Sequence, residues 1–171
     1  APGDGGVAAH RDDGGAAHGR SQRGFGTTWG RMPGRGRAKD LYRIARLLQD
    51  RAREFAVAET LNGGKPIKES RDFDVPMAAA HFFYHAGWAD KLEYAFPGRS
   101  PKPVGVCGQL IPWNFPLPMA AWKMAPALPC GNTAGTKPAG RTALPGAGLA
   151  GTLGRRWTPQ GWVKCISGEG G

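Results

Sequence analysis

The stretch Val104-Gly-Val-Cys-Gly-Gln-Leu-Ile-Pro-Trp-Asn-Phe-Pro116 decides the fold, because it changes abruptly from apolar to turn-forming residues. Its short, nearly continuous apolar run is typical of a buried strand in a parallel sheet. Asn114 and Pro116 end the run, and we expect a helix over residues 117–128 to follow. Gly131 stops that helix, and residues 132–137 can form a second strand. Strand, helix and strand within roughly 35 residues predict a βαβ unit.

The sequence after this unit continues the same alternation. We expect a weak helix near 142–154, weakened by its glycines, and a last strand over 162–167. Together these elements make a βαβαβ arrangement, which is one half of an open parallel sheet. Ligands of such sheets bind beyond the carboxyl ends of the strands, so the residues just after each strand are the informative ones.

The sequence before the unit predicts helices. Between residues 37 and 61, apolar residues recur at steps of three and four, which indicates an amphipathic helix, broken near Asp50. Asn62-Gly63-Gly64 supplies a left-handed cap to end it. Asp74 is the expected N-cap of a second helix that runs to about Glu93.

The composition suits one domain or a piece of a larger protein. The chain has 171 residues, of which 28 are glycine and 15 are proline, so part of it should be irregular. Residues 1–36 show no apolar period, and we expect this Gly/Arg-rich segment to be disordered. A net charge of +10 allows binding to polyanions but does not establish it.

Cysteine usage and hydropathy bear on the cellular setting. Three cysteines, odd in number and without a CxxC pair, favour a reducing, cytoplasmic environment. We find no apolar run long enough to span a bilayer, and the first residues lack the hydrophobic region of a secretory signal. We therefore expect a cytoplasmic protein without a membrane partner.

Motifs after the predicted strands carry a resemblance to a known family. They are Gly105-Val-Cys-Gly-Gln-Leu-Ile-Pro-Trp-Asn-Phe-Pro116, Ala120-Ala-Trp-Lys-Met-Ala-Pro-Ala-Leu128, Gly131-Asn-Thr133 and Lys137-Pro-Ala139. In order and spacing they resemble the NAD(P)-dependent aldehyde dehydrogenase superfamily, and the upstream Glu59-Thr-Leu-Asn-Gly-Gly-Lys-Pro66 agrees with it. The resemblance covers roughly residues 27–171, which is the amino-terminal portion of such an enzyme.

The resemblance implies an α/β fold in which leading helices precede half of a Rossmann-like parallel sheet. We expect residues 37–171 to form a partial cofactor-binding domain of the aldehyde dehydrogenase type, preceded by the disordered segment 1–36. The implied activity is oxidation of an aldehyde to a carboxylic acid with NAD or NADP as cofactor. The implied partners are the aldehyde substrate and the nicotinamide cofactor, and a homo-oligomer is also compatible with the family.

The resemblance also implies roles for individual residues. Asn114 would donate its amide to the oxygen of the thiohemiacetal that forms when a cysteine thiolate attacks the aldehyde. Lys137 would bind the ribose hydroxyls of the cofactor. The remaining cofactor contacts would come from Ile111, Pro112 and Trp113 on the nicotinamide side and from Gly168 and Gly170, where the cofactor approaches the backbone. We expect no metal site.

The sequence departs from the family pattern in two respects. Family members usually carry a glutamate three residues after the ribose-binding lysine, and this chain has Gly140, which removes an acceptor for the ribose. The family's nucleophilic cysteine, general-base glutamate and phosphate-binding loop match no residue in these 171. We therefore expect the chain to be inactive alone, and a non-catalytic truncated fragment is the alternative interpretation.

Other patterns have ordinary explanations. Gly146-Ala-Gly-Leu-Ala-Gly151 fits the dinucleotide fingerprint GxGxxG, but with 28 glycines one such match is expected by chance. His81 and His85 have the spacing of a zinc site but lack the HExxH glutamate and a third ligand. Cys107 and Cys165 fall in expected strands, where thiols are usually inert. The arginines from Arg31 to Arg53 are more typical of a solvated helix face than of a nucleic-acid-binding module, which is the less favoured alternative.

Overall fold

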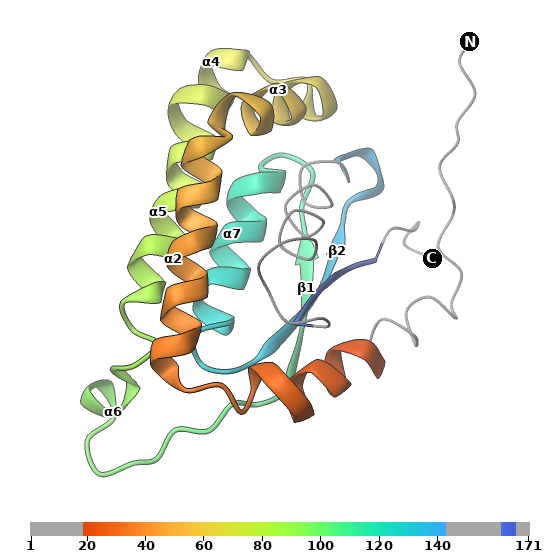
Figure 1. Ribbon diagram of the computed structural model, residues 1–171. Helices are drawn as coiled ribbons and strands as arrows, with labels where there is room; N and C mark the ends of the chain where they lie inside the picture. Colours follow the sequence, from red (N-terminus) through yellow and green to blue (C-terminus); the bar gives the residue numbers. More distant parts are fainter. Residues whose placement is uncertain (1–18, 143–161, 167–171) are drawn as a thin grey trace.

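The computed structural model describes residues 19–142 and 162–166, and in them helices precede a small sheet (Figure 1). Before the first strand lie η1 (Phe25–Trp29), α2 (Gly34–Asp50), α3 (Ala52–Gly63), α4 (Ile67–Glu69), η2 (Ser70–Asp74), α5 (Val75–Ala86) and α6 (Leu92–Ala95). After them come β1 (Val106–Ile111), α7 (Pro116–Ala127), β2 (Thr133–Pro138), η3 (Gly140–Thr142) and β3 (Val163–Cys165). The expected order of leading helices followed by strand, helix and strand is confirmed.

The three described strands form a parallel sheet in the order β1-β2-β3. Val106 pairs with Thr133 and Ile111 pairs with Pro138, so β1 and β2 run side by side over their full lengths. Strands β1 and β3 are shorter than expected, and β2 is shifted by one residue at the expected length, but type, direction and sequence position agree. The helix expected near 142–154 falls almost wholly on residues outside the described part.

Helix α7 packs on one face of the sheet and separates it from the α2 and α5 pair (Figure 1). Gln109 of β1 donates its side-chain amide to the carbonyl oxygen of Lys123 on α7 over 2.9 Å. The Lys123 ammonium in turn donates to the carbonyl oxygen of Leu110. These two bonds fix the strand against the helix that follows it.

Strand β1 is only half covered, contrary to the expected buried strand. Gln109 and Ile111 are 7% and 4% exposed, whereas Leu110 between them is 70% exposed. Alternate side chains of a strand point to opposite faces, so one face of β1 packs on α7 and the other is open. The apolar run gave no alternation, and for that reason the sequence suggested burial on both faces.

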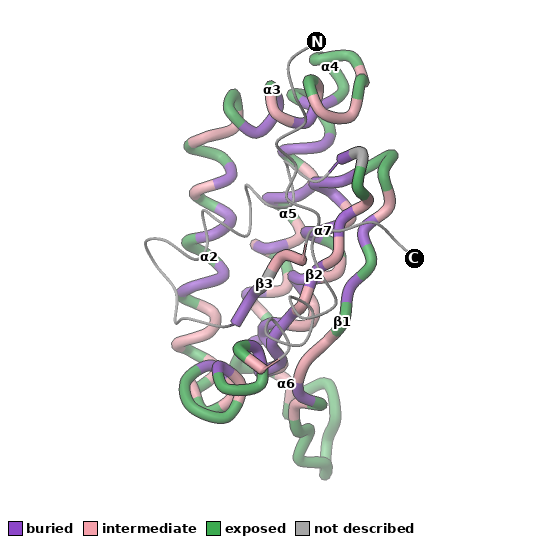
Figure 2. Tube along the Cα trace, turned by 90° about the vertical axis from the view of Figure 1, so that its right-hand side faces the viewer, coloured by how far each residue is buried: buried purple, intermediate pink, exposed green. Residues whose placement is uncertain are grey.

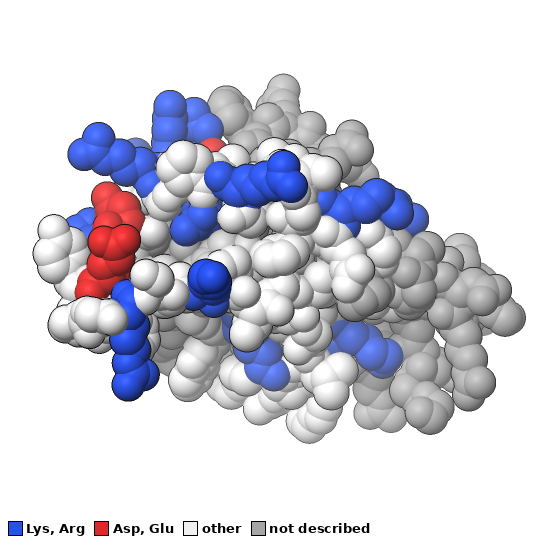
Figure 3. All heavy atoms as spheres, turned by 90° about the horizontal axis from the view of Figure 1, so that it is seen from below, with Lys and Arg blue, Asp and Glu red and all other residues white. Residues whose placement is uncertain are grey.

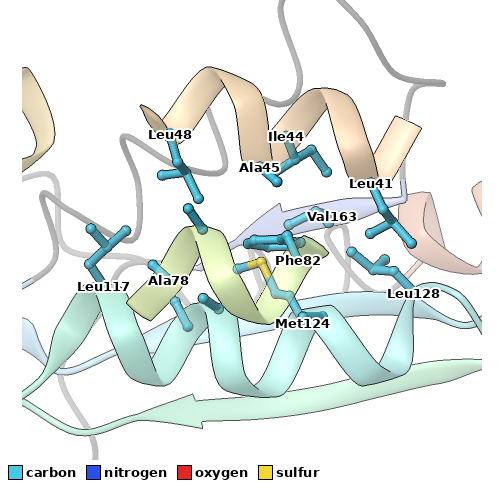
Figure 4. Packing of buried hydrophobic residues seen from close by; sticks show 14 of the residues in the cluster. Leu41, Ile44, Ala45, Leu48, Ala78, Phe82, Leu117, Met124, Leu128 and Val163 are labelled. Carbon is cyan, nitrogen blue, oxygen red and sulfur yellow. The ribbon is translucent and has the colours of Figure 1, made fainter. Parts of the chain in front are cut away.

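The core lies between α2, α5, α7 and the sheet (Figure 4). Its members are large and small apolar side chains that interdigitate, among them Leu41, Ile44, Leu48, Phe82, Leu117, Met124, Leu128 and Val163. Along α2 buried and exposed residues alternate with the helical period (Figure 2), as the spacing of its apolar residues predicts. The expected break falls at Arg51, and Gly64 (φ 72°) is the left-handed cap that ends α3.

The second expected helix differs from the observed one at both ends. The chain is already helical from Ile67, because α4, η2 and α5 follow one another without interruption. Asp74 therefore lies inside a helical stretch with helical dihedral angles and caps nothing. Its carboxylate instead pairs with the Lys65 ammonium at 2.6 Å. Helix α5 ends at Ala86, and turns and the short α6 replace the expected helix up to Glu93.

The expectation of disorder over residues 1–36 is wrong for its second half. Residues 19–24 are helical and lead into η1, and α2 begins at Gly34. Trp29 is fully buried, its indole N–H donates to the carbonyl oxygen of Leu128 over 3.1 Å, and its ring lies 4.5 Å from that of Trp162. The carbonyl oxygen of the buried Ser21 also accepts from the Thr133 hydroxyl over 3.1 Å, so individual long-range contacts hold the segment without an apolar period.

In the described part of the chain, no helix is both long and apolar enough to cross a membrane. Seen from below, lysine and arginine side chains are scattered among uncharged ones and do not gather in one patch (Figure 3). On this face the net positive charge is therefore spread over several separate sites.

Candidate functional site

The carboxyl ends of β1 and β2 lie next to each other, as the predicted parallel sheet requires. Leu110 pairs with Lys137 and Ile111 with Pro138, which are the last two residues of each strand. Just beyond the strands, the backbone N–H of Ala139 donates to the carbonyl oxygen of Ile111 over 3.0 Å. The segment that leads to Asn114 and the segment that contains Lys137 thus leave the sheet side by side.

The segment after β1 carries exposed side chains on a fixed backbone. Ile111 itself is 4% exposed and belongs to the core, so it can offer the site its backbone but little of its side chain. Pro112 is half-buried, Trp113 is 65% exposed, and Asn114 is exposed. Helix α7 begins two residues later at Pro116, so Asn114 lies just before the positive end of the helix dipole.

Lys137 lies on the sheet face that turns away from α7. It pairs with Leu110, whose side chain points away from the core, and paired residues of neighbouring strands share a face. Lys137 is half-buried. Of the other expected cofactor contacts, Gly168 and Gly170 lie outside the described residues.

Gly140, where the family usually has glutamate, opens onto free space. It begins η3 two residues after β2 ends, and a Cβ built there meets no atom of the described residues within 4 Å. It is also exposed. Packing by the described residues therefore does not explain the absence of a glutamate at this position.

A buried ionic cluster lies beneath the segment of residues 112–116, and sequence reasoning did not assign it a role. The carboxylate of Glu59 on α3 is fully buried, and both its oxygens accept from the backbone N–H of Leu117 at 3.3 Å. The Lys65 ammonium lies 3.8 Å from Glu59 and 2.6 Å from the buried Asp74. It also lies 4.2 Å from the centre of the Phe115 ring.

Burial has the largest effect on the pKa of Glu59 in this cluster. Desolvation raises the pKa of Glu59 to about 7, although the Leu117 hydrogen bond and the Lys65 charge both oppose it. Asp74 adds to the rise by its negative charge. The sequence did hold a signal, because Glu59 follows Phe55 by four residues and so falls on the buried side of α3.

Asn132 is a second residue whose structural role the motif alone did not reveal. Its side-chain oxygen accepts from the backbone N–H groups of Val104 and Gly105 at 2.8 and 3.1 Å. Its side-chain nitrogen donates to the carbonyl oxygen of Ala127 over 3.1 Å. One buried amide therefore joins the start of β1 to the end of α7 and the start of β2.

The cysteines are half-buried, and His81 and His85 lie against aromatic rings. Cys107, Cys130 and Cys165 are free and half-buried, and burial raises the pKa of each thiol. Cys107 and Cys165 lie in strands β1 and β3, as expected. The His81 ring stacks on Trp122 at 5.5 Å, and its pKa is lowered mainly by desolvation. Within the described residues no group of three His, Cys, Asp or Glu side chains could hold a metal ion.

A family comparison agrees with the motifs and with the paired strand ends. The model of the aldehyde dehydrogenase family matches residues 7–171. The chain belongs to the aldehyde dehydrogenase family. The match begins some way before the stretch from residue 27 that carries the sequence resemblance.

Curated aldehyde dehydrogenases align with most of the chain. It is 40% identical over 155 residues to human retinal dehydrogenase 2, covering 85% of this chain and 30% of that enzyme. It is 40% identical over 150 residues to the putative aldehyde dehydrogenase DhaS of Bacillus subtilis, covering 83% of this chain and 30% of that protein. The chain thus spans about a third of the length of these relatives.

Solved aldehyde dehydrogenase structures share its fold. PnpE in complex with nicotinamide adenine dinucleotide superposes with a TM-score of 0.88 at 36% identity, over 95% of this chain and 35% of that one. The NAD+ complex of aldehyde dehydrogenase from Bacillus cereus gives 0.85 at 34% identity, over 96% of this chain and 35% of that one. The α/β architecture expected from the sequence is therefore confirmed.

Proposed function

We propose that this chain is the part of an NAD-dependent aldehyde dehydrogenase that holds the cofactor ribose and the carbonyl oxygen of the aldehyde. The observation that supports this most directly is the Ile111–Ala139 hydrogen bond, which keeps the two strand ends together. Asn114 and Lys137 then serve one site from neighbouring strands. Open parallel sheets bind their ligands at this edge.

Asn114 acts on the substrate oxygen. When a nucleophile attacks an aldehyde, negative charge grows on that oxygen, and a fixed donor stabilises it. An amide suits this role because it donates hydrogen bonds and does not titrate. The exposed Asn114 lies at the N-terminus of α7, a helix of 12 residues, whose dipole also favours negative charge.

Lys137 acts on the cofactor. Its ammonium offers three donors on a flexible stem, which suits a pair of ribose hydroxyls and lowers the cost of nearby phosphate charge. The described residues leave room for a dinucleotide beside Lys137, because the exposed Gly140 at the start of η3 has no side chain. When bound, NAD would supply the acceptor for the hydride that leaves the substrate carbon. Similar structures that hold NAD, such as PnpE, support the choice of this cofactor.

We also propose that these 171 residues do not oxidise aldehydes without further chain. Covalent aldehyde oxidation needs a thiolate, and burial raises the pKa of all three thiols here. Incubation of the purified chain with acetaldehyde and NAD+ should therefore give no NADH absorbance. Steady NADH production that stops after thiol alkylation would contradict this proposal.

Calorimetric titration with NAD+ tests cofactor binding. We compare the unsubstituted chain with Lys137→Met, which keeps the stem and removes the donors, and we expect roughly tenfold weaker binding from the loss of a charged hydrogen bond. Lys39→Met is the matched control, since it removes the same charge from an exposed position of α2. If the two variants bind NAD+ equally, or the unsubstituted chain does not bind it, the proposal fails.

A further inference from the structure

The first turn of α7 has an unusual shortage of backbone donors. Pro116 and Pro118 carry no N–H, so Leu117 alone offers one among the first three residues. The residue before the helix, Phe115, makes no side-chain capping bond. Glu59, from a helix 58 residues earlier in the chain, accepts this single N–H with both carboxylate oxygens. The start of α7 is thus capped by a distant buried side chain.

A second contact from the same cluster holds the neighbouring residue. The Lys65 ammonium lies 4.2 Å from the centre of the Phe115 ring, a distance at which a cation is attracted to the ring face. Lys65 is kept there by Asp74 at 2.6 Å, and both Asp74 and Glu59 are fully buried. Phe73 also contacts the Phe115 ring edge-on, with centroids 6.5 Å apart.

We propose that Glu59, Lys65 and Asp74 form a positioning network that fixes Phe115 and Leu117 and thereby sets the place of the Asn114 amide. Asn114 lies one residue before the ring that Lys65 contacts and three before the N–H that Glu59 accepts. The catalytic consequence of this network rests on the proposed function of Asn114. The network's effect on the loop does not depend on that function.

The network should respond to pH. Two buried carboxylates share one ammonium, and Lys65 lies closer to Asp74 than to Glu59. Protonation of Glu59 weakens its acceptance from Leu117, because an ionised acceptor makes the stronger bond. Lys65 and Asp74 are the charged groups placed against Glu59 within the described residues. His81 also titrates, but it stacks on Trp122, so the Trp122 indole reports it separately.

Nitrogen-15 NMR of the full 171-residue chain tests the network. The Leu117 backbone amide, the Trp113 indole and the Asn114 side-chain amide should shift together with pH, with one midpoint near 7. In Glu59→Gln these shifts should be lost, while the Trp122 indole keeps its own titration. Glu93→Gln, which removes an exposed carboxyl group on α6, is the matched control and should leave all of them unchanged.

Lys65→Met provides an independent variant. It should displace the Trp113 and Asn114 resonances while the Trp29 indole, bonded to Leu128, stays in place and reports an intact fold. The proposal is overturned if Leu117 titrates but Trp113 and Asn114 do not move, since Glu59 would then be a structural cap only. If a variant fails to fold, the titration of the unsubstituted chain decides alone. NAD+ added to the same samples tests the proposed cofactor site separately. If NAD+ causes no shifts but the pH-dependent shifts are present, the positioning network is supported and the cofactor site is not.

Discussion

Ala139 donates its backbone N–H to the carbonyl oxygen of Ile111 over 3.0 Å, just where β1 and β2 end. This bond extends the pairing of the two strands by one residue beyond Pro138. It brings the loop that carries Asn114 alongside Lys137, although 23 residues of sequence separate them. The oxyanion and ribose contacts that we propose for Asn114 and Lys137 can therefore belong to one site.

Gly140→Glu should tighten NAD+ binding by roughly tenfold, the effect of one added charged hydrogen bond. The position is exposed, and no atom of the described residues lies within 4 Å of a Cβ built there, so these residues leave room for the side chain. Calorimetric titration measures the change. Gly26→Glu, at another open glycine, controls for the added negative charge. Equal affinities for the two variants would show that a carboxylate at position 140 does not reach the ribose.

Asn132→Ala should lower the free energy of unfolding by about 2–4 kcal/mol, because it removes a buried amide whose three hydrogen bonds reach the backbone of Val104, Gly105 and Ala127. Urea denaturation followed by circular dichroism measures the loss. Asn132→Asp keeps the acceptor and should cost less. The exposed Gln49→Ala on α2 should change stability by less than about 0.5 kcal/mol. A similarly small effect at Asn132 would refute its role as an anchor.

Stability should fall as pH rises through the titration of Glu59. Its folded-state pKa is raised from 4.5 to about 7, so between these values the folded chain keeps a proton that the unfolded chain has released. The free energy of unfolding then decreases with rising pH, by up to roughly 3 kcal/mol from this group. Glu59→Gln lacks this component, so the difference between its urea stability and that of the unsubstituted chain isolates it. Parallel pH dependences of the two proteins would contradict the prediction.

Trp29→Ala should destabilise the whole chain by about 3–5 kcal/mol, since it removes a fully buried ring that packs on Trp162 and bonds to Leu128. Trp29→Phe keeps most of the apolar surface and should cost less than half as much. Thermal unfolding measures both effects. If the alanine variant unfolds at the same temperature as the unsubstituted chain, Trp29 does not anchor residues 19–30, and the sequence-based expectation of disorder there would stand.

Sequence patterns predicted the elements whose cause is local. The apolar steps of α2, the glycine cap at Gly64 and the run that forms β1 each depend on residues a few positions apart, and all three agree with the structure. Motif spacing also placed Asn114 just after β1 and Lys137 at the end of the neighbouring strand β2. Their chemical roles, like those of Ile111, Pro112 and Trp113, remain predictions.

Contacts between distant residues escaped prediction. The hydrogen bond from Trp29 to Leu128 joins residues 99 positions apart, and the residues around Trp29 do not predict it. Asp74 was expected to cap a helix, but its carboxylate forms an ion pair with Lys65 and the helical stretch begins earlier in the chain. Glu59 is fixed by Leu117, a partner that only the folded chain brings close.

Mapping the NAD+ site by nitrogen-15 NMR tests the central claim most directly. We expect the backbone amides of residues 113–115 and of 137 and 139–140 to shift along one binding curve as NAD+ is added, because both segments leave the sheet at the same edge. Amides in the first half of α2, near Leu41, should remain in place, because this part of the helix lies toward Leu128, at the other end of α7 from Asn114 (Figure 4). Shifts confined to one of the two segments, or centred on α2, would contradict a cofactor site at the ends of β1 and β2.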